Sequence, residues 1–594
     1  MSSTKNQKND SSQMKKILSP EAESHEGGGS ASEHNNSPSS PSGESKGAGN
    51  ERNRPLCQPP TRSVSREPEQ SPAVFIGKNI AVGMEEFRRA PKCSMELDSL
   101  EFGPKHTVLI DIKAFKTYQE LKPVSGLDIW NTDYVKMPYS EKNIMIESGV
   151  FTDSKKPRWE KIKKSLSKLN RIATSKAIEE AIKSYNMKYK DEWHFDALHM
   201  FFSRVDDRNK REYFSIIERM ANLAVNLPLI CPKSIPLLKA EEDRIITLSH
   251  EQIACLLANA FFCTFPHRNS KRSEFSNYPD INFNRMFADG SEQKRQKLMT
   301  ILHYFEMVLA KMPKGLVTFE RRHLKDKICW KSSKLEVTDL HVSDEGTIEE
   351  DGAGMLQVDF ACAMVGGGVL GSGLVQEEIR FLINPELIVS RLFTEKLQDC
   401  DCLRVTGTQQ FSKYKGYSNS FKWMGPHHLP ENTKRDKWMR LYTEIVLIDA
   451  IKFKERQQQF HMDFINRELH KAYCGFCENN IPEDYCTAIA TGNWGCGAFN
   501  GDPRLKALIQ IMAASQAKRQ LAYFTFGDQQ LAKDIRYMHN FLAKQKILVG
   551  TLYNLLHDYC VSEKSHNTAV REKSHNTSEL YQFIYKCVYQ PHST

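Results

Sequence analysis

The stretch from Val365 to Glu378 constrains the fold more than any other part of the sequence. It reads VGGGVLGSGLVQEE, with five glycines in eight positions and an amide and two carboxylates at the end. Glycine tolerates positive φ and lets a ligand approach the backbone closely, so this stretch predicts a loop wrapped around a ligand. The segment Leu356 to Phe360 before it alternates like a strand, and Ile379 to Ile383 after it is mostly apolar. The loop should therefore place Glu377 and Glu378 at the start of the second element.

Two common nucleotide-binding loops do not fit this stretch. It lacks the Gly-Lys-Ser/Thr ending of a phosphate-binding loop, and a loose glycine match is weak evidence for a dinucleotide site. From the residues alone, the alternative is a glycine-rich surface turn followed by two solvated glutamates.

Several separate blocks of the sequence resemble poly(ADP-ribose) glycohydrolases. The first block is Gly366, Gly367 and Gly368, seven intervening residues, and then Gln376-Glu377-Glu378. Val358 to Ala361 and Thr491 to Phe499 are similar to the same family. The resemblance extends from roughly Thr107 to the C-terminus, and the blocks follow one another in the same order.

The resemblance and the residue pattern together predict an α/β fold class. We expect a macrodomain-like mixed sheet flanked by helices, preceded by a mostly helical accessory domain and a disordered N-terminal tail. The expected boundaries are 1–75 for the tail, 76–314 for the accessory domain and 315–594 for the catalytic domain. Residues 1–75 are rich in Ser, Pro, Gly, Lys and Glu and cannot bury enough apolar surface to offset chain entropy.

Hydrophobic periodicity predicts the individual elements. Strands are expected over 335–342, 356–365, 403–406, 443–449, 488–491, 521–526 and 580–588, and helices over 159–185, 248–265 and 293–312. Asn384 and Asp502, each followed by proline, and Asp528 are each expected to cap a helix.

The two adjacent glutamates set limits on the chemistry. Neighbouring side chains diverge, so Glu377 and Glu378 cannot flank a scissile bond as the separated carboxylates of ordinary glycosidases do. One carboxylate should transfer a proton while the other positions the sugar. The resemblance implies that Glu378 is the acid/base, that Glu377 orients the ribose, and that Asp359 is a further active-site residue. From the residues alone, Asp359 is a satisfied turn or cap carboxylate.

The resemblance also implies a set of ligand contacts. Ile348 and Glu349 match positions that touch the adenine, and Gln376 and Tyr417 match further contacts. A second glycine loop matches the diphosphate-binding loop and consists of Asn493, Trp494, Gly495, Cys496, Gly497 and Ala498. From the residues alone, Phe499 and Phe526 are core aromatics. The resemblance implies that one or both form walls for the adenine, because an aromatic face stacks on a base.

Position 362 departs from the family pattern. Where the family has asparagine after Phe-Ala, this chain has Cys362. Asparagine offers two donors and an acceptor, whereas a thiol is a weak donor and acceptor. We still predict an enzyme that hydrolyses ribose–ribose bonds in poly(ADP-ribose) and releases ADP-ribose. The alternatives are a non-catalytic or weakly active reader of the polymer and an enzyme that removes single ADP-ribose units from proteins.

Composition limits the remaining expectations. No apolar run approaches the roughly 20 residues of a membrane span, and fifteen scattered cysteines favour a reducing compartment. Cys474 and Cys477 are expected to be structural thiols rather than a redox motif or half a zinc site. We expect no cofactor or metal, no direct DNA binding, a monomer, and a location in nucleus or cytoplasm. The partners implied are poly(ADP-ribose) on modified proteins, as in the DNA damage response, and ADP-ribose as product.

Overall fold

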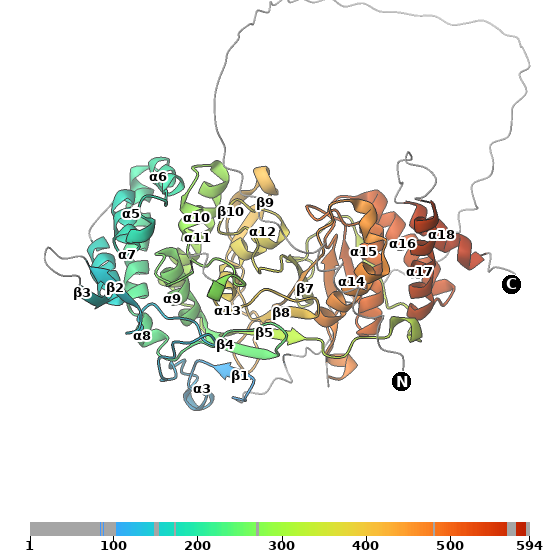
Figure 1. The fold of residues 1–594 in the computed structure, drawn as a ribbon, viewed down its shortest axis with the longest axis horizontal. Coiled ribbons are helices and arrows are strands. Elements are labelled where there is room, and N and C mark those ends of the chain that lie inside the picture. The colour runs from blue at the N-terminus through green and yellow to red at the C-terminus, as the bar shows by residue number, and fades with distance from the viewer. Residues whose placement is uncertain are drawn as a thin grey trace, which may run out of the picture. The chain divides into compact units, whose positions relative to one another are not determined.

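The computed structural model describes residues 102–147, 154–170, 174–268, 273–478, 481–566 and 578–589, together with residues 84, 87 and 95. All of them belong to the second of the two units into which the chain divides, Gly77–Thr594. The tail expected over residues 1–75 lies outside the described residues. Figure 1 shows the arrangement of the helices and strands.

A nine-stranded mixed sheet forms the centre of the described structure. Its strand order is β1-β4-β5-β8-β11-β7-β12-β13-β6. The strands are β1 (His106–Val108), β4 (Arg244–Ser249), β5 (Leu316–His323), β6 (Leu340–Ser343), β7 (Leu356–Ala361), β8 (Asp401–Thr406), β11 (Glu444–Asp449), β12 (Ile489–Gly492) and β13 (Leu521–Phe524). Two small sheets pair β2 (Ile144–Glu147) with β3 (Ser154–Pro157) and β9 (Ser412–Lys415) with β10 (Lys422–Pro426).

Five neighbouring strands of this sheet run parallel. These are β11, β7, β12, β13 and β6, whereas β4, β5, β8 and β11 pair antiparallel in turn. Parallel strands end at the same edge of a sheet, so the loops that follow β7, β11, β12 and β13 meet there. The strands predicted over 335–342 and 356–365 are both shorter in the structure, and β7 ends at Ala361 before the glycine loop begins.

Helices cover both faces of the sheet. The α-helices described in full are α3 (Ile112–Tyr118), α4 (Arg158–Leu166), α5 (Ser175–Ser184), α6 (Asp196–Ser203), α7 (Asp207–Val225), α8 (Leu227–Ile230), α9 (His250–Phe261), α10 (Asn284–Phe287), α11 (Glu292–Ala310), α12 (Gln376–Ile383), α13 (Ser390–Phe393), α14 (Met462–Phe476), α15 (Pro503–Gln516), α16 (Gln529–Lys544), α17 (Val549–His566) and α18 (Ser578–Tyr589). Alternate residues of β11 divide between two cores: Ile445 and Leu447 face α9, α11 and α12, and Val446 and Ile448 face α14 and α15.

The segment before Met312 contains strands as well as helices. It was expected to be largely helical, but β1 and β4 join the main sheet, and β4 pairs antiparallel with β5. The apolar segment expected as a helix over 248–265 begins instead within β4, and its helix α9 runs from His250 to Phe261. Ser249 begins α9 with a capping box to Gln252. The sheet therefore continues across residue 315, and the division at that residue stays a prediction.

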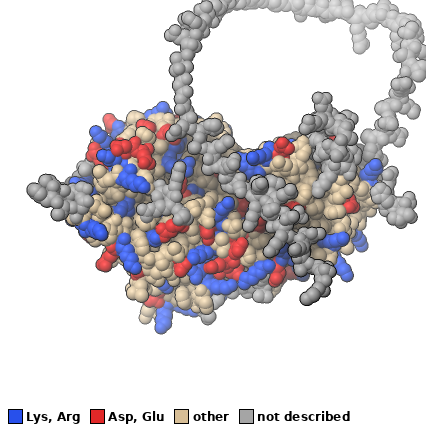
Figure 2. All heavy atoms as spheres, viewed as in Figure 1, with Lys and Arg blue, Asp and Glu red and all other residues tan. Residues whose placement is uncertain are grey.

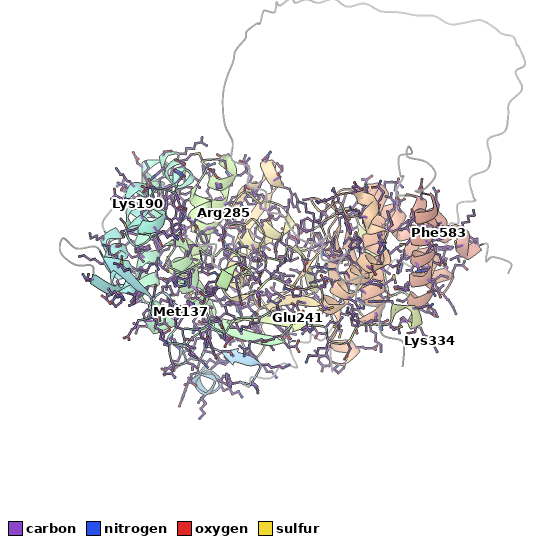
Figure 3. All side chains as sticks on the ribbon, in the orientation of Figure 1. Met137, Lys190, Glu241, Arg285, Lys334 and Phe583 are labelled. Carbon is purple, nitrogen blue, oxygen red and sulfur yellow. The ribbon has the colours of Figure 1, made fainter. Side chains whose placement is uncertain are left out.

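Two further expectations about elements are wrong. The long helix predicted over 159–185 is interrupted, because α4 ends near Leu166 and Thr174 caps a new helix, α5. The final strand predicted over 580–588 is the helix α18. Its aromatic and β-branched residues suggested a strand, but Leu580 and Ile584 are four residues apart and both are buried, as on one helix face. Phe583, labelled in Figure 3, packs edge-to-face against Tyr559 of α17.

The predicted helix caps at Asp502 and Asp528 are confirmed, whereas Asn384 precedes the 3₁₀ helix Pro385–Val389 without a capping hydrogen bond from its side chain. Asp502 accepts hydrogen bonds from the backbone N–H groups of Arg504 and Leu505 at the start of α15. Asp528 accepts one from Leu531 at the start of α16. On the face seen in Figure 2, positive and negative side chains are interspersed. No helix in the described ranges is long and apolar enough to cross a membrane.

Candidate active site

A cavity of about 370 Å³ lies at the carboxyl ends of the parallel strands. The loops after β7, β11, β12 and β13 and the start of α12 all contribute to its wall. The lining residues are Phe360, Ala361, Cys362, Val375, Gln376, Glu377, Glu378, Tyr417, Ala450, Asn493, Trp494, Gly495, Cys496, Gly497, Ala498, Phe499 and Phe526. Ligands of α/β proteins commonly bind at this edge of the sheet, outside the carboxyl ends of the strands.

The glycine loop holds both glutamates through backbone N–H groups. Glu377 accepts hydrogen bonds from Cys362 at 2.9 Å and from Gly366 at 2.6 Å. Glu378 accepts hydrogen bonds from Gly368 at 2.8 Å and from Val375 at 2.9 Å. Both side chains are buried, and both lie in the first turn of α12, where the helix dipole favours negative charge. The loop therefore fixes all four carboxylate oxygens with its own backbone.

Gly367 lies between the two carboxylates. Its φ is +42°, and a Cβ added to it would stand 2.5 Å from Oε1 of Glu378 and 2.7 Å from Oε2 of Glu377. A real Cβ does not come so close to another heavy atom. Only glycine fits at this position without moving a glutamate, which explains why the loop needs glycine there.

Glu377, Glu378 and Asp359 form a cluster of buried carboxyl groups. Burial, with the negative charges of Asp359 and Glu378, raises the pKa of Glu377 well above its usual range, against the opposing effect of its backbone hydrogen bonds. Burial also raises the pKa of Asp359 to about 8; Glu378 adds to this shift and Arg380 opposes it. Like charges this close cannot all ionise in a dry environment, so the cluster holds at least one proton at neutral pH.

Asp359 does not line the cavity. Its side chain is fully buried on β7, and neither of its carboxyl oxygens has a hydrogen-bond partner among the described residues. It is therefore not the satisfied turn or cap carboxylate that the residues alone allowed. Its position beneath Glu377 and Glu378 lets it influence the site through charge rather than through contact with a ligand.

We expect Asp359 to make stability fall as pH rises. An unfolded aspartate has a pKa of about 3.9. Because the folded-state pKa is raised to about 8, the native state holds a proton that the unfolded state releases between these two pH values. The associated stability is complete below about pH 4 and is lost as pH rises through about 8. The variant Asp359→Asn lacks this proton and should lose this pH dependence.

The measurement is the free energy of unfolding of wild type and Asp359→Asn from pH 5 to pH 8.5. We expect the difference in favour of the variant to grow with pH, by on the order of several kcal/mol across the range. A difference between the two proteins that stays constant with pH would show that Asp359 ionises normally in the folded protein.

The second glycine loop forms the opposite wall of the cavity and is anchored from below. Trp494 is buried, its indole N–H donates to the Ile448 carbonyl at 2.9 Å, and the ammonium of Lys506 lies 4.3 Å from its ring centroid. Lys506 also forms an ion pair with Glu468 of α14. Buried charges on α14 and α15 therefore help to hold the loop after β12.

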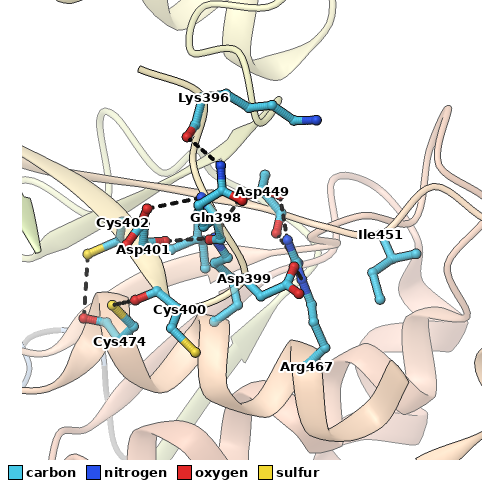
Figure 4. A network of polar contacts seen from close by, with 12 residues as sticks. Lys396, Gln398, Asp399, Cys400, Asp401, Cys402, Asp449, Ile451, Arg467 and Cys474 are labelled. Atoms are coloured by element: carbon cyan, nitrogen blue, oxygen red, sulfur yellow. Dashed lines mark hydrogen bonds and ion pairs between the residues drawn. The ribbon is translucent and has the colours of Figure 1, made fainter. Parts of the chain in front are cut away.

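A network of polar contacts fixes the end of β11 next to this loop (Figure 4). Arg467 of α14 donates to the carbonyl and the carboxylate of Asp449 and to the Asp399 carboxylate. In the same network the Cys474 thiol donates to the Cys400 carbonyl at 3.1 Å. This anchoring sets the position of Ala450, which lines the cavity directly after Asp449.

The structure brings together most of the residues predicted for the site. Cys362, Gln376, Glu377, Glu378, Tyr417, the run from Asn493 to Phe499, and Phe526 all line the cavity. Ile348 does not; it is buried in a small core with Phe524. Glu349 accepts a hydrogen bond from Tyr414 at 2.7 Å instead. Gly366, Gly367 and Gly368 do not line the cavity. Gly366 and Gly368 donate N–H groups to the glutamates, whereas the N–H of Gly367 donates to the Met364 carbonyl.

Four cavity residues were not predicted from the sequence: Phe360, Ala361, Val375 and Ala450. The first three flank the predicted motif directly, and their adjacency to it was the available signal. Ala450 has no such signal, because β11 neighbours β7 only in the folded sheet. The thiols of Cys474 and Cys477 donate to nearby backbone carbonyls.

The fold and the site define a hydrolase-like α/β protein, with buried carboxyl groups at a cavity on the carboxyl edge of a mixed sheet. Comparisons with known proteins agree. The profile described as poly(ADP-ribose) glycohydrolase, macro domain fold, matches residues 328–533, and the helical-domain profile of the same family matches residues 205–321.

Curated relatives match about three fifths of the chain. Poly(ADP-ribose) glycohydrolase 1 of Arabidopsis thaliana is 31% identical over 447 residues, covering 61% of this chain and 80% of the relative. The probable poly(ADP-ribose) glycohydrolase 2 of the same plant is 30% identical over 437 residues, covering 62% and 82%. Poly(ADP-ribose) glycohydrolase 1 of Caenorhabditis elegans is 34% identical over 390 residues, covering 62% and 48%. The chain belongs to the poly(ADP-ribose) glycohydrolase family and is a glycohydrolase with a macro-domain catalytic part and a helical domain before it.

Proposed function

We propose that this chain hydrolyses the ribose–ribose O-glycosidic bonds of poly(ADP-ribose) and releases ADP-ribose, with Glu378 as the acid/base. The observation that carries the proposal is the placement of Glu378. Its carboxyl group lines the cavity while N–H groups of Gly368 and Val375 hold its two oxygens. A general acid/base needs such a fixed position within reach of the reacting atoms.

The proposed reaction uses Glu378 twice. As the bond between the anomeric carbon and the leaving oxygen breaks, the carboxylic acid of Glu378 gives its proton to that oxygen, and positive charge develops on the sugar. The resulting carboxylate then takes a proton from a water molecule, whose oxygen bonds to the anomeric carbon. The acid is thereby restored, and the products are ADP-ribose and a polymer with a free ribose hydroxyl at its end.

Glu377 and Asp359 have different parts in this proposal. Glu377 also lines the cavity, and it is bound to the loop through Cys362 and Gly366, so it is placed to hold a ribose hydroxyl beside Glu378. Asp359 lies behind both, and because burial raises its pKa to about 8 it is mostly protonated at neutral pH. We therefore assign the stabilisation of positive charge on the sugar to the carboxyl groups at the cavity and not to Asp359.

The remaining cavity residues fit the rest of an ADP-ribose unit. The loop from Asn493 to Ala498 offers backbone N–H groups for the diphosphate, as glycine loops before helices do. Phe499 and Phe526 offer aromatic faces for the adenine, and Phe526 is 38% exposed at the cavity rim. Tyr417, also at the rim, is 41% exposed, so its ring is accessible to a ligand. Ile348 and Glu349 do not line the cavity, so an adenine could touch them only if it extended past the lining residues.

The experiment compares two substrates for the purified protein. One is a protein that carries long poly(ADP-ribose), and the other carries single ADP-ribose units on its side chains. We expect free ADP-ribose to accumulate from the polymer while the singly modified protein keeps its unit. Release from the singly modified protein with the polymer left intact would contradict the proposed bond and favour the side-chain hydrolase.

Cys362 favours a second candidate function, a weakly active reader of the polymer. Its thiol lines the cavity beside Glu377, at the place where the family has asparagine. Burial raises the pKa of this thiol above its usual range, so it stays neutral and bonds only weakly to a sugar. A reader would bind ADP-ribose units without releasing them.

We expect Cys362→Asn to gain in ADP-ribose affinity or in polymer turnover. A directed hydrogen bond from an amide is worth about 0.5–1.5 kcal/mol net, which corresponds to roughly three- to tenfold. The measurement is ADP-ribose binding by calorimetry and ADP-ribose release for both proteins, with melting temperatures to confirm folding. A folded variant with neither gain would show that the site has adapted around the thiol.

A further inference from the structure

The glycine loop is bound on both sides of its backbone. Its N–H groups point to Glu377 and Glu378, as described above. Its carbonyl groups point the other way, to two buried cations that come from different helices, Lys297 of α11 and Arg391 of α13. Neither cation lines the cavity.

Arg391 acts on both glutamates through two peptide groups. One of its terminal nitrogens donates to the Val365 carbonyl at 2.6 Å and to the Gly367 carbonyl at 3.1 Å. The peptide group of Val365 ends in the N–H of Gly366, which donates to Glu377. The peptide group of Gly367 ends in the N–H of Gly368, which donates to Glu378. A single guanidinium nitrogen therefore orients two of the four peptide groups that hold these carboxyls, one for each glutamate.

Arg391 is itself fixed in place. Its side chain is buried, and its Nε donates to the Asp280 carbonyl at 2.7 Å. A Cβ on Gly366 would stand 2.9 Å from the same terminal nitrogen, so the loop and the guanidinium fit closely. Hydrogen bonds in series polarise one another, and a cation on the carbonyl strengthens the N–H of the same peptide group as a donor.

Lys297 holds the remainder of the loop from the helical part of the protein. Its ammonium donates to the carbonyls of Val369 at 3.0 Å and Gly371 at 2.8 Å, and it also contacts those of Gly368 and Gly373. The side chain is fully buried, and burial lowers its pKa to about 7; Glu378 opposes this shift, and Lys294 and Arg391 add to it. The apolar loop residues Val369, Leu370 and Leu374 pack into the same helical core.

We propose that Lys297 and Arg391 are positioning residues for catalysis, which hold the carbonyl side of the glycine loop and thereby aim its N–H groups at Glu377 and Glu378. This inference rests on the proposed function of Glu378. It also gives the helical domain a part in the reaction, because Lys297 extends from α11 to the catalytic loop.

The main test is Lys297→Met, compared with Lys294→Met. Lys294 lies one turn earlier on α11 and is also buried, but its ammonium donates to the carbonyls of Arg285 and Ala288, outside the loop. We expect Lys297→Met to lower kcat for polymer hydrolysis about 100-fold, as small displacements of catalytic groups do. ADP-ribose affinity should stay within about threefold, because the cavity wall is unchanged. Lys294→Met should keep the wild-type kcat at a similar melting temperature.

A double-mutant comparison separates positioning from general stability. If Lys297 acts through Glu378, Lys297→Met should cost nothing further in the Glu378→Gln background. An equal loss in both backgrounds would show a structural role alone and would overturn the inference. If Lys297→Met does not fold, Arg391→Lys is the test instead, because lysine keeps the charge and a similar volume but lacks the guanidinium group. We expect kcat to fall at least tenfold. An unchanged kcat would overturn the inference.

The results also distinguish this inference from the proposed function. Full activity of Glu378→Gln would contradict the assignment of Glu378, whatever Lys297 does. An inactive Glu378→Gln beside a Lys297→Met variant as fast as Lys294→Met would leave the proposed function in place and refute the positioning role.

Discussion

Glu378→Gln should lower the rate of polymer hydrolysis by about 10²–10⁴-fold, the usual contribution of a general acid/base. The amide keeps the shape of the side chain and one of the two oxygens that accept from the loop, but its NH2 group faces the other loop N–H and it carries no acidic proton to transfer. ADP-ribose affinity should therefore stay within about threefold of wild type. The measurement is single-turnover release of ADP-ribose at saturating enzyme, with binding followed separately by calorimetry.

Glu377→Gln should be measured beside Glu378→Gln as a comparison. Both glutamates occupy the first turn of α12, and each accepts two backbone N–H groups, so the two substitutions disturb the loop alike. Our assignment expects the larger loss in the chemical step at Glu378. If Glu378→Gln keeps more than about a tenth of the wild-type rate, Glu378 is not the acid/base.

Gly367→Ala should reduce activity at least about 100-fold, because the added methyl group displaces both carboxylates. Its Cβ would stand 2.5 Å from Glu378 and 2.7 Å from Glu377, and the backbone φ of +42° adds strain for any residue with a Cβ. We expect the folded variant to bind polymer but to release little ADP-ribose. The measurement is kcat and melting temperature together.

Gly354→Ala is the matched control for this substitution. Gly354 also has positive φ, at +81°, but a Cβ there would meet nothing within 4 Å. The control should lose roughly 1–2 kcal/mol of stability through the backbone alone and keep its turnover. Similar activity losses in both variants would show that backbone strain, and not the clash with the glutamates, explains the effect of Gly367→Ala.

The local parts of the site were predictable from the sequence. The glycine density, the strand pattern before it and the two glutamates after it predicted a strand, a loop and a second element that begins at the glutamates, and the structure has β7, the glycine loop and α12 in that order. The caps at Asp502 and Asp528 were equally local, because a side-chain oxygen and the following N–H groups lie within three residues. Such signals do not depend on the rest of the fold.

The parts that failed depend on tertiary contacts. Nothing near β1 or β4 shows that they join the main sheet, because their partners lie far away in the sequence. The aromatic residues of α18 are typical of a strand, and only the burial of this segment against other helices shows why it is helical. Lys297 lies in the segment 293–312, for which the sequence predicted a helix and no role in the site, and only the folded loop supplies the carbonyl groups that it binds.

The most direct test of the central claim is the amount of ADP-ribose that a known amount of protein releases from labelled poly(ADP-ribose). Wild-type protein and Glu378→Gln are incubated with excess polymer, and free ADP-ribose and protein-bound polymer are measured over time. We predict that wild-type protein releases many ADP-ribose units per protein molecule, whereas Glu378→Gln binds the polymer and releases almost none. Polymer that stays bound and intact with the wild-type protein would contradict the account and identify the chain as a reader.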